Sequence, residues 1–417
     1  MTSAGIDLTD LDRFADGFPH AVFTALRREA PVWFHPPTAH TPGGEGFWVL
    51  SRYAEVQAAA ADAATFSSAT GGGRDGGGTL IEDLPLGFAA GVLLNMMDDP
   101  RHKHIRKLVT PLVAPRALAA MTADLRTRTA GILDAVAQRG ACDFVTDVAA
   151  ELPLQAIAGL LGVPQADRHQ LFAWANVTLD YDDRALGAHN DRTMAASAAL
   201  FDYGARLIAE KRRHPGDDML SAVLHGHVPG TDGTREPVTD LEAQMFFNLL
   251  VAAGSETTRN SIAVGLMALI ERPQAWRALA ADRSLLPTAV EEILRWASST
   301  PYNRRTATRD VTLAGTTIRA GDKVTLWWAS ANRDEAVFAE PFRFDVRRQP
   351  NPHFAFGHGS HFCLGAALAR LEIRLVLDGL LDRFDAIALN GRVEWTRSNK
   401  HTGVRHMPVV VQRRQCG

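Results

Sequence analysis

The sequence predicts a mainly α-helical fold with small β-sheets, organised as one domain over residues 1–417. Three observations support this. Residues 98–295 and 364–382 read mainly as helix, and short β-like pieces are confined to 31–60, 311–328 and 393–411. No Pro/Ser-rich linker or internal repeat divides the chain, which favours one large domain over several small ones.

The elements follow in order along the chain. Aromatic and β-branched residues between turn signals predict strands at 31–34 and 46–50. The composition from 98 to about 211 is rich in Ala, Leu and Arg and predicts helix. A long helix is expected over 240–272, capped by Thr239 or Asp240 and ended by Pro273. Further strands are expected at 311–313 and 322–328, then a last helix over 364–382 and a terminal hairpin over 393–411.

Composition excludes several classes of protein. The net charge of −3 argues against a globally basic nucleic-acid binder. The three cysteines, Cys142, Cys363 and Cys416, predict no disulfide framework and a reducing compartment. The first residues lack a basic segment followed by an apolar one, so no signal peptide is expected. No apolar run reaches 18 residues, so we expect a cytoplasmic protein without a membrane span.

A glycine-rich segment at 71–78 matches the pattern G-x-G-x-x-G of dinucleotide-binding loops. Its context disagrees, because no clear strand precedes the glycines and Pro85 prevents a helix from opening soon after them. We therefore predict a flexible surface loop, in particular a mobile flap over a pocket.

The segment 354–366 surrounds Cys363 with glycines and histidines just before a helical pattern. Free N–H groups at a helix start stabilise a thiolate. Three interpretations are open at this point: a buried structural cysteine, a zinc site that also uses His353, His358 and His361, or a single thiolate ligand of haem iron. The histidine spacing lacks the paired pattern of zinc sites, which disfavours the second.

The same segment resembles the haem-binding loop of the cytochrome P450 family, F-x-x-G-x-(H/R)-x-C-x-G. It matches at Phe356, Gly359, His361, Cys363 and Gly365. The resemblance implies a fold in which haem b lies between a long central distal helix and the helix that follows the cysteine loop. It also implies that Cys363 is the axial ligand of the iron and that Phe356 and Gly365 lie beside the haem.

Residues 253–258 resemble the family's (A/G)-G-x-(D/E)-T-T motif on the distal helix, although a buried helix with a polar face would give a similar pattern. The resemblance implies that Ala253 and Gly254 let the helix pass close to the haem. It implies that Thr257 positions hydrogen bonds near the distal oxygen and that Glu256 relays protons.

Charged residues supply a structural pair and cofactor contacts. Glu292 and Arg295 match the family's E-x-x-R, and the resemblance implies that they lock the core together with an arginine from 342–348. This role is structural rather than catalytic. The haem propionates need cationic or hydrogen-bonding partners, and the residues in the family's positions are His102, Arg106, Arg305 and His361. Asp99 replaces a proline of the family's motif before His102.

The resemblance also implies a pocket built from several segments. Its expected lining is mostly apolar and fits a hydrophobic substrate: Phe88, Leu94, Met96, Phe247, Leu250, Thr300, Tyr302, Asn303, Thr402 and Val404. The motifs look most like those of actinobacterial members that act on sterols, terpenoids or branched lipids. The implied reaction inserts one atom of O2 into such a molecule or another secondary metabolite, such as a polyketide.

Alternatives to this reaction are desaturation, epoxidation, ring closure or coupling by the same chemistry, or haem binding without catalysis. No redox module is fused to the chain, so the resemblance implies that a ferredoxin and an NAD(P)H-dependent ferredoxin reductase supply the electrons. A basic patch for an acidic ferredoxin is expected from Lys103, Lys107, Arg116, Arg348 and Arg370.

Overall fold

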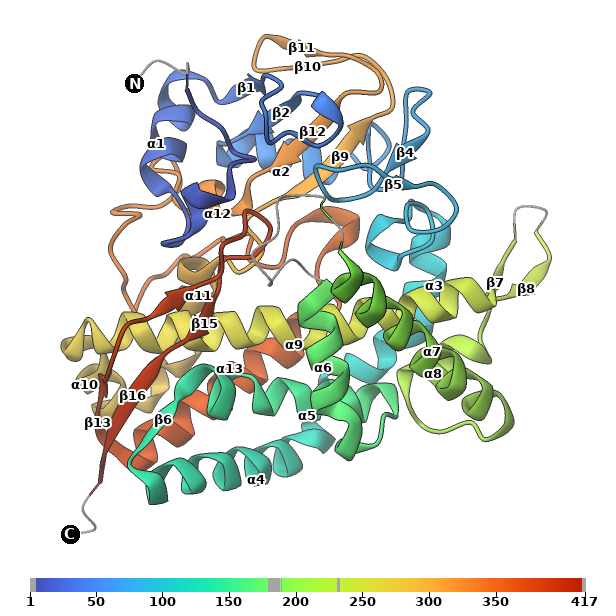
Figure 1. Cartoon of the computed structure of the whole chain (residues 1–417). Coiled ribbons are helices and arrows are strands. Elements are labelled where there is room, and N and C mark those ends of the chain that lie inside the picture. The colour runs from blue at the N-terminus through green and yellow to red at the C-terminus, as the bar shows by residue number, and fades with distance from the viewer. Residues whose placement is uncertain (1–4, 179–187, 189, 231–232, 415–417) are drawn as a thin grey trace.

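The computed structural model describes residues 5–178, 188, 190–230 and 233–414. Helices make up most of it: α1 (His20–Glu29), α2 (Tyr53–Ala61), α3 (Arg101–Val109), α4 (Pro115–Arg139), α5 (Glu151–Leu161), α6 (Arg168–Thr178), α7 (Asp191–Arg213), α8 (Met219–Leu224), α9 (Asp240–Ile270), α10 (Pro273–Ala281), α11 (Leu286–Ala297), α12 (Trp328–Ala331) and α13 (Ala366–Arg383). In the view of Figure 1 most of them lie below a β-rich layer that also holds the helices α1, α2 and α12.

The long helix α9 crosses the middle of the molecule, with α4, α5 and α13 on one side of it and the β-rich layer on the other (Figure 1). Its start is fixed by a capping box: Thr239 Oγ1 accepts from the Glu242 N–H at 3.2 Å, and the Glu242 carboxylate accepts from the Thr239 N–H at 2.8 Å. It ends just before Pro273, as the sequence predicts. Because both sides of α9 are covered, most of its residues are buried, including polar ones such as Glu256.

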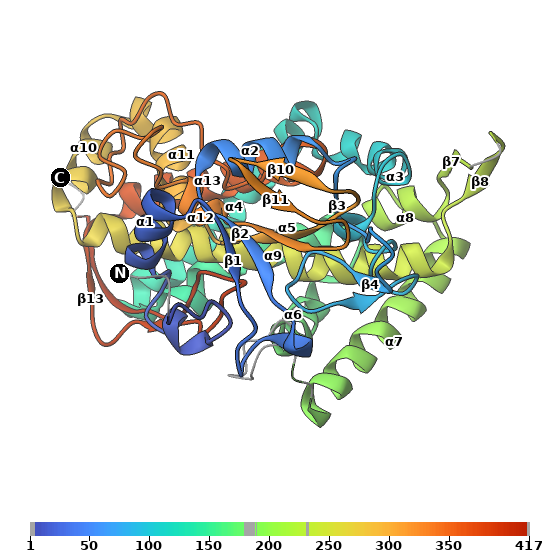
Figure 2. The same cartoon turned by 90° about the horizontal axis from the view of Figure 1, so that it is seen from above.

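The largest sheet joins segments from both ends of the chain. It contains five strands in the order β1 (Val32–His35), β2 (Phe47–Leu50), β12 (Lys323–Leu326), β9 (Asn303–Ala307) and β3 (Phe66–Ser67). Strand β12 runs parallel to β2 and antiparallel to β9. Seen from above, α9 passes beneath this sheet (Figure 2). The expected β-rich segment 31–60 is only half strand, because its second half forms the helix α2. An Ala-rich run there favours helix over strand.

The terminal segment 393–411 is not one hairpin, which corrects the prediction. Strand β14 (Glu394–Trp395) pairs with β15 (Val404–His406), and the two form a short sheet. Strand β16 (Pro408–Arg413) instead pairs with β13 (Phe384–Leu389) and with the distant β6 (Ala141–Asp143). The remaining two-stranded sheets are β4 (Gly76–Gly77) with β5 (Leu84–Pro85), β7 (His227–Pro229) with β8 (Arg235–Pro237), and β10 (Val311–Leu313) with β11 (Thr316–Ile318).

The glycine-rich segment lies at the surface, where Gly72, Gly73 and Asp75 are exposed, but it is held by contacts with the rest of the protein. Gly72 has a φ of 61° and lies so close to the backbone of Gly321 that a Cβ would collide with it. Arg74 forms ion pairs with Glu45 and Asp83 and donates to the Gly321 carbonyl at 2.9 Å. These contacts hold the segment against the sheet.

No single helix among the described residues is long and apolar enough to cross a membrane. One bent pair, Arg101–Val113 with Pro115–Arg139, reaches the necessary length and composition together. Cys142 and Cys363 are both free thiols, and Cys416 lies outside the described residues.

Candidate functional site

A cavity of about 980 Å³ lies between α9 and the loop that leads into α13. Its wall includes Ala253, Glu256 and Thr257 from α9, and Phe356 and Cys363 from the loop. The structure therefore brings together two motifs that are more than 100 residues apart in the sequence, and the chemistry of the site follows from what faces this space.

The cysteine loop is a tight, hydrogen-bonded turn. The Phe354 N–H donates to Asn332 Oδ1 at 2.7 Å, and the Cys363 N–H donates to the Phe356 carbonyl at 2.9 Å. Gly359 has a φ of 73°, and a Cβ there would collide with the Ala60 carbonyl of α2. Glycine is therefore required at this position, both by conformation and by space. These contacts fix where the cysteine side chain points.

Cys363 is a free, solvent-accessible thiol that lines the cavity. Burial raises the pKa of its thiol, whereas the Gly365 N–H and the positive charges of Arg106 and Arg370 act to lower it. A Cβ on Gly365 would lie 4.0 Å from the sulfur and would meet nothing closer. The loop thus presents the Cys363 sulfur to an open space. The backbone donor and the cations near the sulfur favour a thiolate, the form that binds a metal.

The wall from α9 contains the predicted Ala253, Glu256 and Thr257. The Thr257 hydroxyl donates to the Ala253 carbonyl at 3.3 Å, a long hydrogen bond within the helix. Gly254 does not face this wall: a Cβ there would lie 2.7 Å from the Ile157 side chain of α5. The small size of Gly254 lets α5 pack closely on α9, and its contact with the cofactor stays a prediction.

A buried arginine and a histidine form another part of the wall. Arg305 is 6% exposed, and burial lowers the pKa of its guanidinium to about 10 against the opposing charge of Asp98. Burial and the nearby Arg305 and His102 lower the pKa of His361 to about 2. Arg305 Nη1 donates to the Arg304 carbonyl at 2.8 Å, and no carboxylate of the described residues lies within ion-pair distance of Arg305. An anion bound in the cavity would offset the free-energy cost of burying the Arg305 charge without a counter-charge.

The other two predicted propionate contacts lie behind this wall. The His102 ring stacks on His361 with centroids 4.1 Å apart, and Arg106 lies close enough for its charge to act on Cys363. Neither His102 nor Arg106 is among the residues that line the cavity, so their contact with a cofactor stays a prediction.

Asp99, which replaces the family's proline, joins α3 to the cysteine loop. One carboxylate oxygen accepts from His102 Nδ1 at 3.0 Å, and the other accepts from Ser360 Oγ at 2.5 Å and pairs with Lys103 Nζ at 2.9 Å. Partial burial raises the pKa of Asp99, but these hydrogen bonds outweigh it and lower the pKa to about 2. The sequence showed that Asp99 departs from the motif, but not what it binds, because Ser360 is 261 residues away.

Comparison with known proteins agrees with this geometry. The family model described as cytochrome P450 matches residues 138–410. A protein named cytochrome P450 126 from Mycobacterium tuberculosis is 51% identical, over 99% of this chain and 100% of the relative. This chain belongs to the cytochrome P450 family.

More distant relatives cover nearly the whole chain. A methyl-branched lipid omega-hydroxylase of Mycobacterium tuberculosis is 39% identical over 98% of this chain and 95% of the relative. The structure of a Mycobacterium marinum cytochrome P450 in complex with pseudoionone superimposes with a TM-score of 0.88 at 35% identity, covering 98% of both chains. The predicted mainly α fold with small sheets is confirmed.

The residues of this P450 fit the family's haem. The cavity presents one thiol, from Cys363, on the loop that faces α9, and the buried Arg305 supplies a cation suited to a propionate. The zinc interpretation finds no support in the described residues, where no group of three or more metal-binding side chains occurs. His353 instead contacts Glu291 at 3.2 Å, and the His358 ring lies 5.5 Å from Phe354.

The predicted substrate pocket is partly corrected. Met96, Thr300 and Asn303 line the cavity of this P450, as expected. The other predicted residues lie outside the wall: Phe88 is 49% exposed, Leu94, Phe247, Tyr302, Thr402 and Val404 are buried in packing contacts, and Leu250 packs against the main core. On α9 the helical phase explains the error, because Asn248, Leu249 and Ala252 face the cavity, whereas the Phe247 ring stacks on Tyr203.

The wall residues that were not predicted include a lysine and a histidine. Lys400 and His401 lie at the tip between β14 and β15 and line the cavity. Lys400 Nζ donates to the Thr79 and Tyr302 carbonyls at 3.2 and 3.1 Å, and burial lowers its pKa to about 7. The sequence offers no local signal for them, because a Lys-His pair in a turn is typical of an exposed loop.

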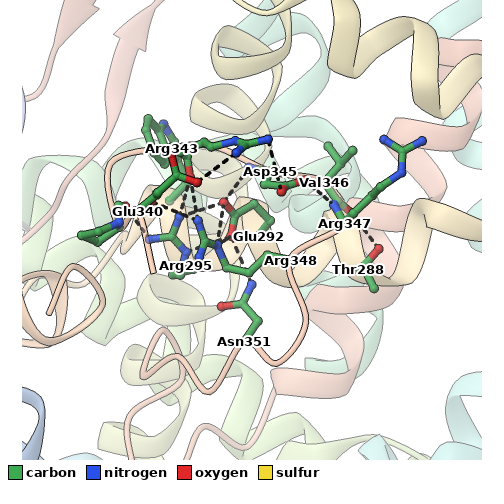
Figure 3. A network of polar contacts seen from close by, with 12 residues as sticks. Thr288, Glu292, Arg295, Glu340, Arg343, Asp345, Val346, Arg347, Arg348 and Asn351 are labelled. Carbon is green, nitrogen blue, oxygen red and sulfur yellow. Dashed lines mark hydrogen bonds and ion pairs between the residues drawn. The ribbon is translucent and has the colours of Figure 1, made fainter. Parts of the chain in front are cut away.

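The predicted pairing of Glu292 with Arg295 is confirmed, and Figure 3 shows the network around it. Arg295 donates to both carboxylate oxygens at 2.7 and 2.8 Å, and both side chains are fully buried. The expected arginine from 342–348 is Arg348, whose Nε lies 3.1 Å from the Glu292 carboxylate. Glu292 also accepts from the Asp345 N–H at 2.8 Å and from Asn351 at 3.2 Å. The network ties α11 to the segment that leads into the cysteine loop.

Proposed function

We propose that this cytochrome P450 inserts one oxygen atom from O2 into a hydrophobic lipid-like or terpenoid molecule. Cys363 is the ligand of the haem iron, Thr257 and Glu256 deliver protons, and a separate ferredoxin and its reductase supply electrons. The observation that carries the proposal is that the cysteine thiol of Cys363 lines the same cavity as Ala253 and Thr257 of α9.

The haem, when bound, supplies the chemistry of reducing O2 with two electrons and two protons and of transferring one oxygen atom to a C–H bond. The protein does the rest. The Cys363 loop holds the sulfur in place through its backbone hydrogen bonds, and Arg305 with His361 binds the propionates. Ala253 leaves room next to the Thr257 hydroxyl, which can exchange its long hydrogen bond to Ala253 for one to a ligand. Glu256 holds the proton to be delivered.

The substrate class is inferred from the wall of the cavity. Its apolar residues come from the loop before α3, from α7 and from α9, and they include Leu93, Met96, Leu200, Phe201, Met245 and Leu249. Such a surface binds a hydrophobic molecule and excludes water from the reacting carbon. The name of the methyl-branched lipid omega-hydroxylase supports a branched lipid, and the bound pseudoionone of the structural relative supports a similar apolar compound.

The docking patch for a ferredoxin needs one correction. The Arg348 side chain is only 10% exposed and is held by Glu292, so it offers no charge to a partner. Lys103 is 61% exposed and Arg370 is 37% exposed, and Lys107 and Arg116 are exposed as well. Lys103 pairs with Asp99 and Arg370 pairs with Glu291. We infer that the exposed Lys107 and Arg116 attract an acidic ferredoxin most strongly, with an association rate that falls as salt is added.

The ligand is tested by the carbon monoxide difference spectrum of the dithionite-reduced protein. We expect the strongly red-shifted Soret band of a thiolate-ligated haem in the wild type and its loss in Cys363→Ser. Cys142→Ser is the matched control, because Cys142 lies on β6 outside the cavity wall. A wild type without this band, or a Cys363→Ser variant that keeps it, would contradict the proposal.

The substrate class is tested by titrating the ferric protein with a methyl-branched fatty acid, a steroid and pseudoionone. Binding is read from the spin-state shift of the Soret band. A compound that binds is then incubated with NADPH, a surrogate ferredoxin and its reductase. A product heavier by one oxygen atom supports insertion, whereas a loss of two hydrogens or a coupled product indicates one of the alternative outcomes. Binding of none of the three compounds would refute the assigned class.

A further inference from the structure

The tip between β14 and β15 is fixed against the part of α9 that carries Glu256. Gly403 lies so close to the Asn260 side chain that a Cβ would collide with it. The Thr402 N–H donates to the Ser299 carbonyl at 3.0 Å, and the His401 N–H donates to Ser398 Oγ at 3.2 Å. The position of the tip over α9 is therefore set by packing.

This placement brings the His401 ring to Glu256. His401 Nδ1 lies 4.0 Å from Glu256 Oε2, and both residues line the cavity. The Glu256 side chain is 1% exposed and that of His401 is 12% exposed. The other Glu256 oxygen accepts from Arg259 Nη2 at 3.3 Å. The carboxylate thus lies between an arginine on its own helix and an imidazole from the tip, one residue before Thr257.

The charges around His401 determine its protonation. Glu256 and Arg259 face it from α9, and Lys400 precedes it in the tip. Burial, and then the positive charges of Lys400 and Arg259, lower the pKa of His401 to about 3. The imidazole is neutral near pH 7, so one ring nitrogen carries a proton and the other accepts one. A neutral imidazole can therefore give a proton on one side while it takes one on the other.

We propose that His401 is the proton-transfer partner of Glu256 and resupplies the proton that Glu256 delivers toward Thr257. The inference rests on the proposed function and names a further residue of the same site. In the step, the Nδ1–H bond of His401 breaks, an O–H bond forms at Oε2 of Glu256, and Nε2 of His401 takes a replacement proton from water. A small rotation of either side chain, or one bridging water, closes the gap of 4.0 Å. His401 acts on the reaction only through Glu256.

Three variants of the haem-loaded protein test this inference. His401→Phe keeps a ring of similar size without nitrogen atoms, and His401→Gln keeps a hydrogen-bonding group that cannot pass a proton on. His406→Phe is the matched control: it lies on β15, is 51% exposed, and pairs with Asp143 rather than with Glu256. The measured quantity is the share of consumed O2 that is released as hydrogen peroxide, with NADPH, a surrogate ferredoxin and its reductase and no added substrate.

We expect a several-fold rise in the peroxide share in both His401 variants and no change in His406→Phe, because slower proton delivery leaves O2 only partly reduced. Glu256→Gln should raise the share as well, and adding His401→Phe to it should raise it no further. An unchanged share in His401→Phe, an additive double variant, or a normal share in His401→Gln would each overturn proton transfer through His401.

A second measurement does not depend on turnover. The imidazole ¹⁵N resonances of His401 in the ferrous, carbon monoxide-bound protein should shift in Glu256→Gln, and those of His406 should stay in place. If the ¹⁵N chemical shifts of His401 do not change in Glu256→Gln, the contact between the two side chains is contradicted. The carbon monoxide spectrum is recorded first for every protein. A normal band with an unchanged peroxide share contradicts the His401 inference alone, whereas a wild type without the band contradicts ligation by Cys363.

Discussion

Burial predicts that two ion pairs with the same sequence spacing differ in what they contribute to stability. Glu292 pairs with Arg295 and Glu340 pairs with Arg343, each at i, i+3, and both pairs appear in Figure 3. The first pair is fully buried, whereas the side chains of the second are 68% and 61% exposed. Substituting Gln for each glutamate removes one charge and leaves the shape of the side chain almost unchanged.

The expected magnitudes follow from these surroundings. Glu292→Gln leaves Arg295 and Arg348 buried without their counter-charge, and losing one partner of a buried pair costs about 3–5 kcal/mol. Glu340→Gln removes an exposed pair worth roughly 0.5 kcal/mol. Because the Glu292 network holds Asn351, just before the cysteine loop, Glu292→Gln should also weaken haem retention.

The assay is urea unfolding, followed by tryptophan fluorescence and Soret absorbance in the same samples. We expect the fluorescence midpoint of Glu292→Gln to fall well below that of the wild type, with the Soret band lost at still lower urea. The midpoint of Glu340→Gln should stay close to that of the wild type. Comparing midpoints avoids assuming a two-state transition in a protein of this size with a cofactor. Equal shifts in the two variants would refute the reasoning from burial.

Three further outcomes follow from the site. Thr257→Ala should raise the share of O2 released as peroxide several-fold while leaving the carbon monoxide spectrum normal, and an unchanged share would remove Thr257 from proton delivery. Gly254→Ala should lower the free energy of unfolding by about 1–3 kcal/mol, seen as a lower urea midpoint, because its Cβ would lie 2.7 Å from Ile157, with haem binding intact. Asp99→Asn should destabilise at pH 7 but not near pH 2, because a carboxylate whose pKa is lowered to about 2 stabilises above its ordinary 3.8 and loses that contribution as pH falls. A difference between Asp99→Asn and the wild type that persists at pH 2 would refute this assignment.

Features with a local cause could be predicted from the sequence. The ends of α9 follow from Thr239 and Pro273, and the turn around Cys363 follows from glycines within a few residues of it. The pairing of Glu292 with Arg295 needs only one turn of helix. The family resemblance added what spacing alone could not supply, namely which of several E-x-x-R pairs is buried.

Features that depend on tertiary neighbours could not be predicted. Strand β16 pairs with β6 and β13 rather than with β15, and nothing in its own residues specifies those partners. On α9, apolar residues occur on all sides, so their pattern does not reveal which face meets the cavity, and Leu250 was chosen where Leu249 lines it. A small residue such as Gly254 is typical of a cofactor contact, but here the Ile157 side chain packs against the position where its Cβ would be.

The two halves of the site depend on the chain in different ways. The sulfur of Cys363 is positioned by a short loop that makes hydrogen bonds of its own, such as that from the Cys363 N–H to the Phe356 carbonyl, and is anchored to Asn332 and Asp99. The carboxylate of Glu256 instead meets a tip that lies about 145 residues further along, held there by the tight fit of Gly403 on Asn260. Under the proposed role of Glu256, a change in packing at the tip alters proton delivery while the haem-binding motif stays intact. In this chain we therefore expect substitutions at the tip, as well as in the motif, to change how tightly electron use is coupled to product formation.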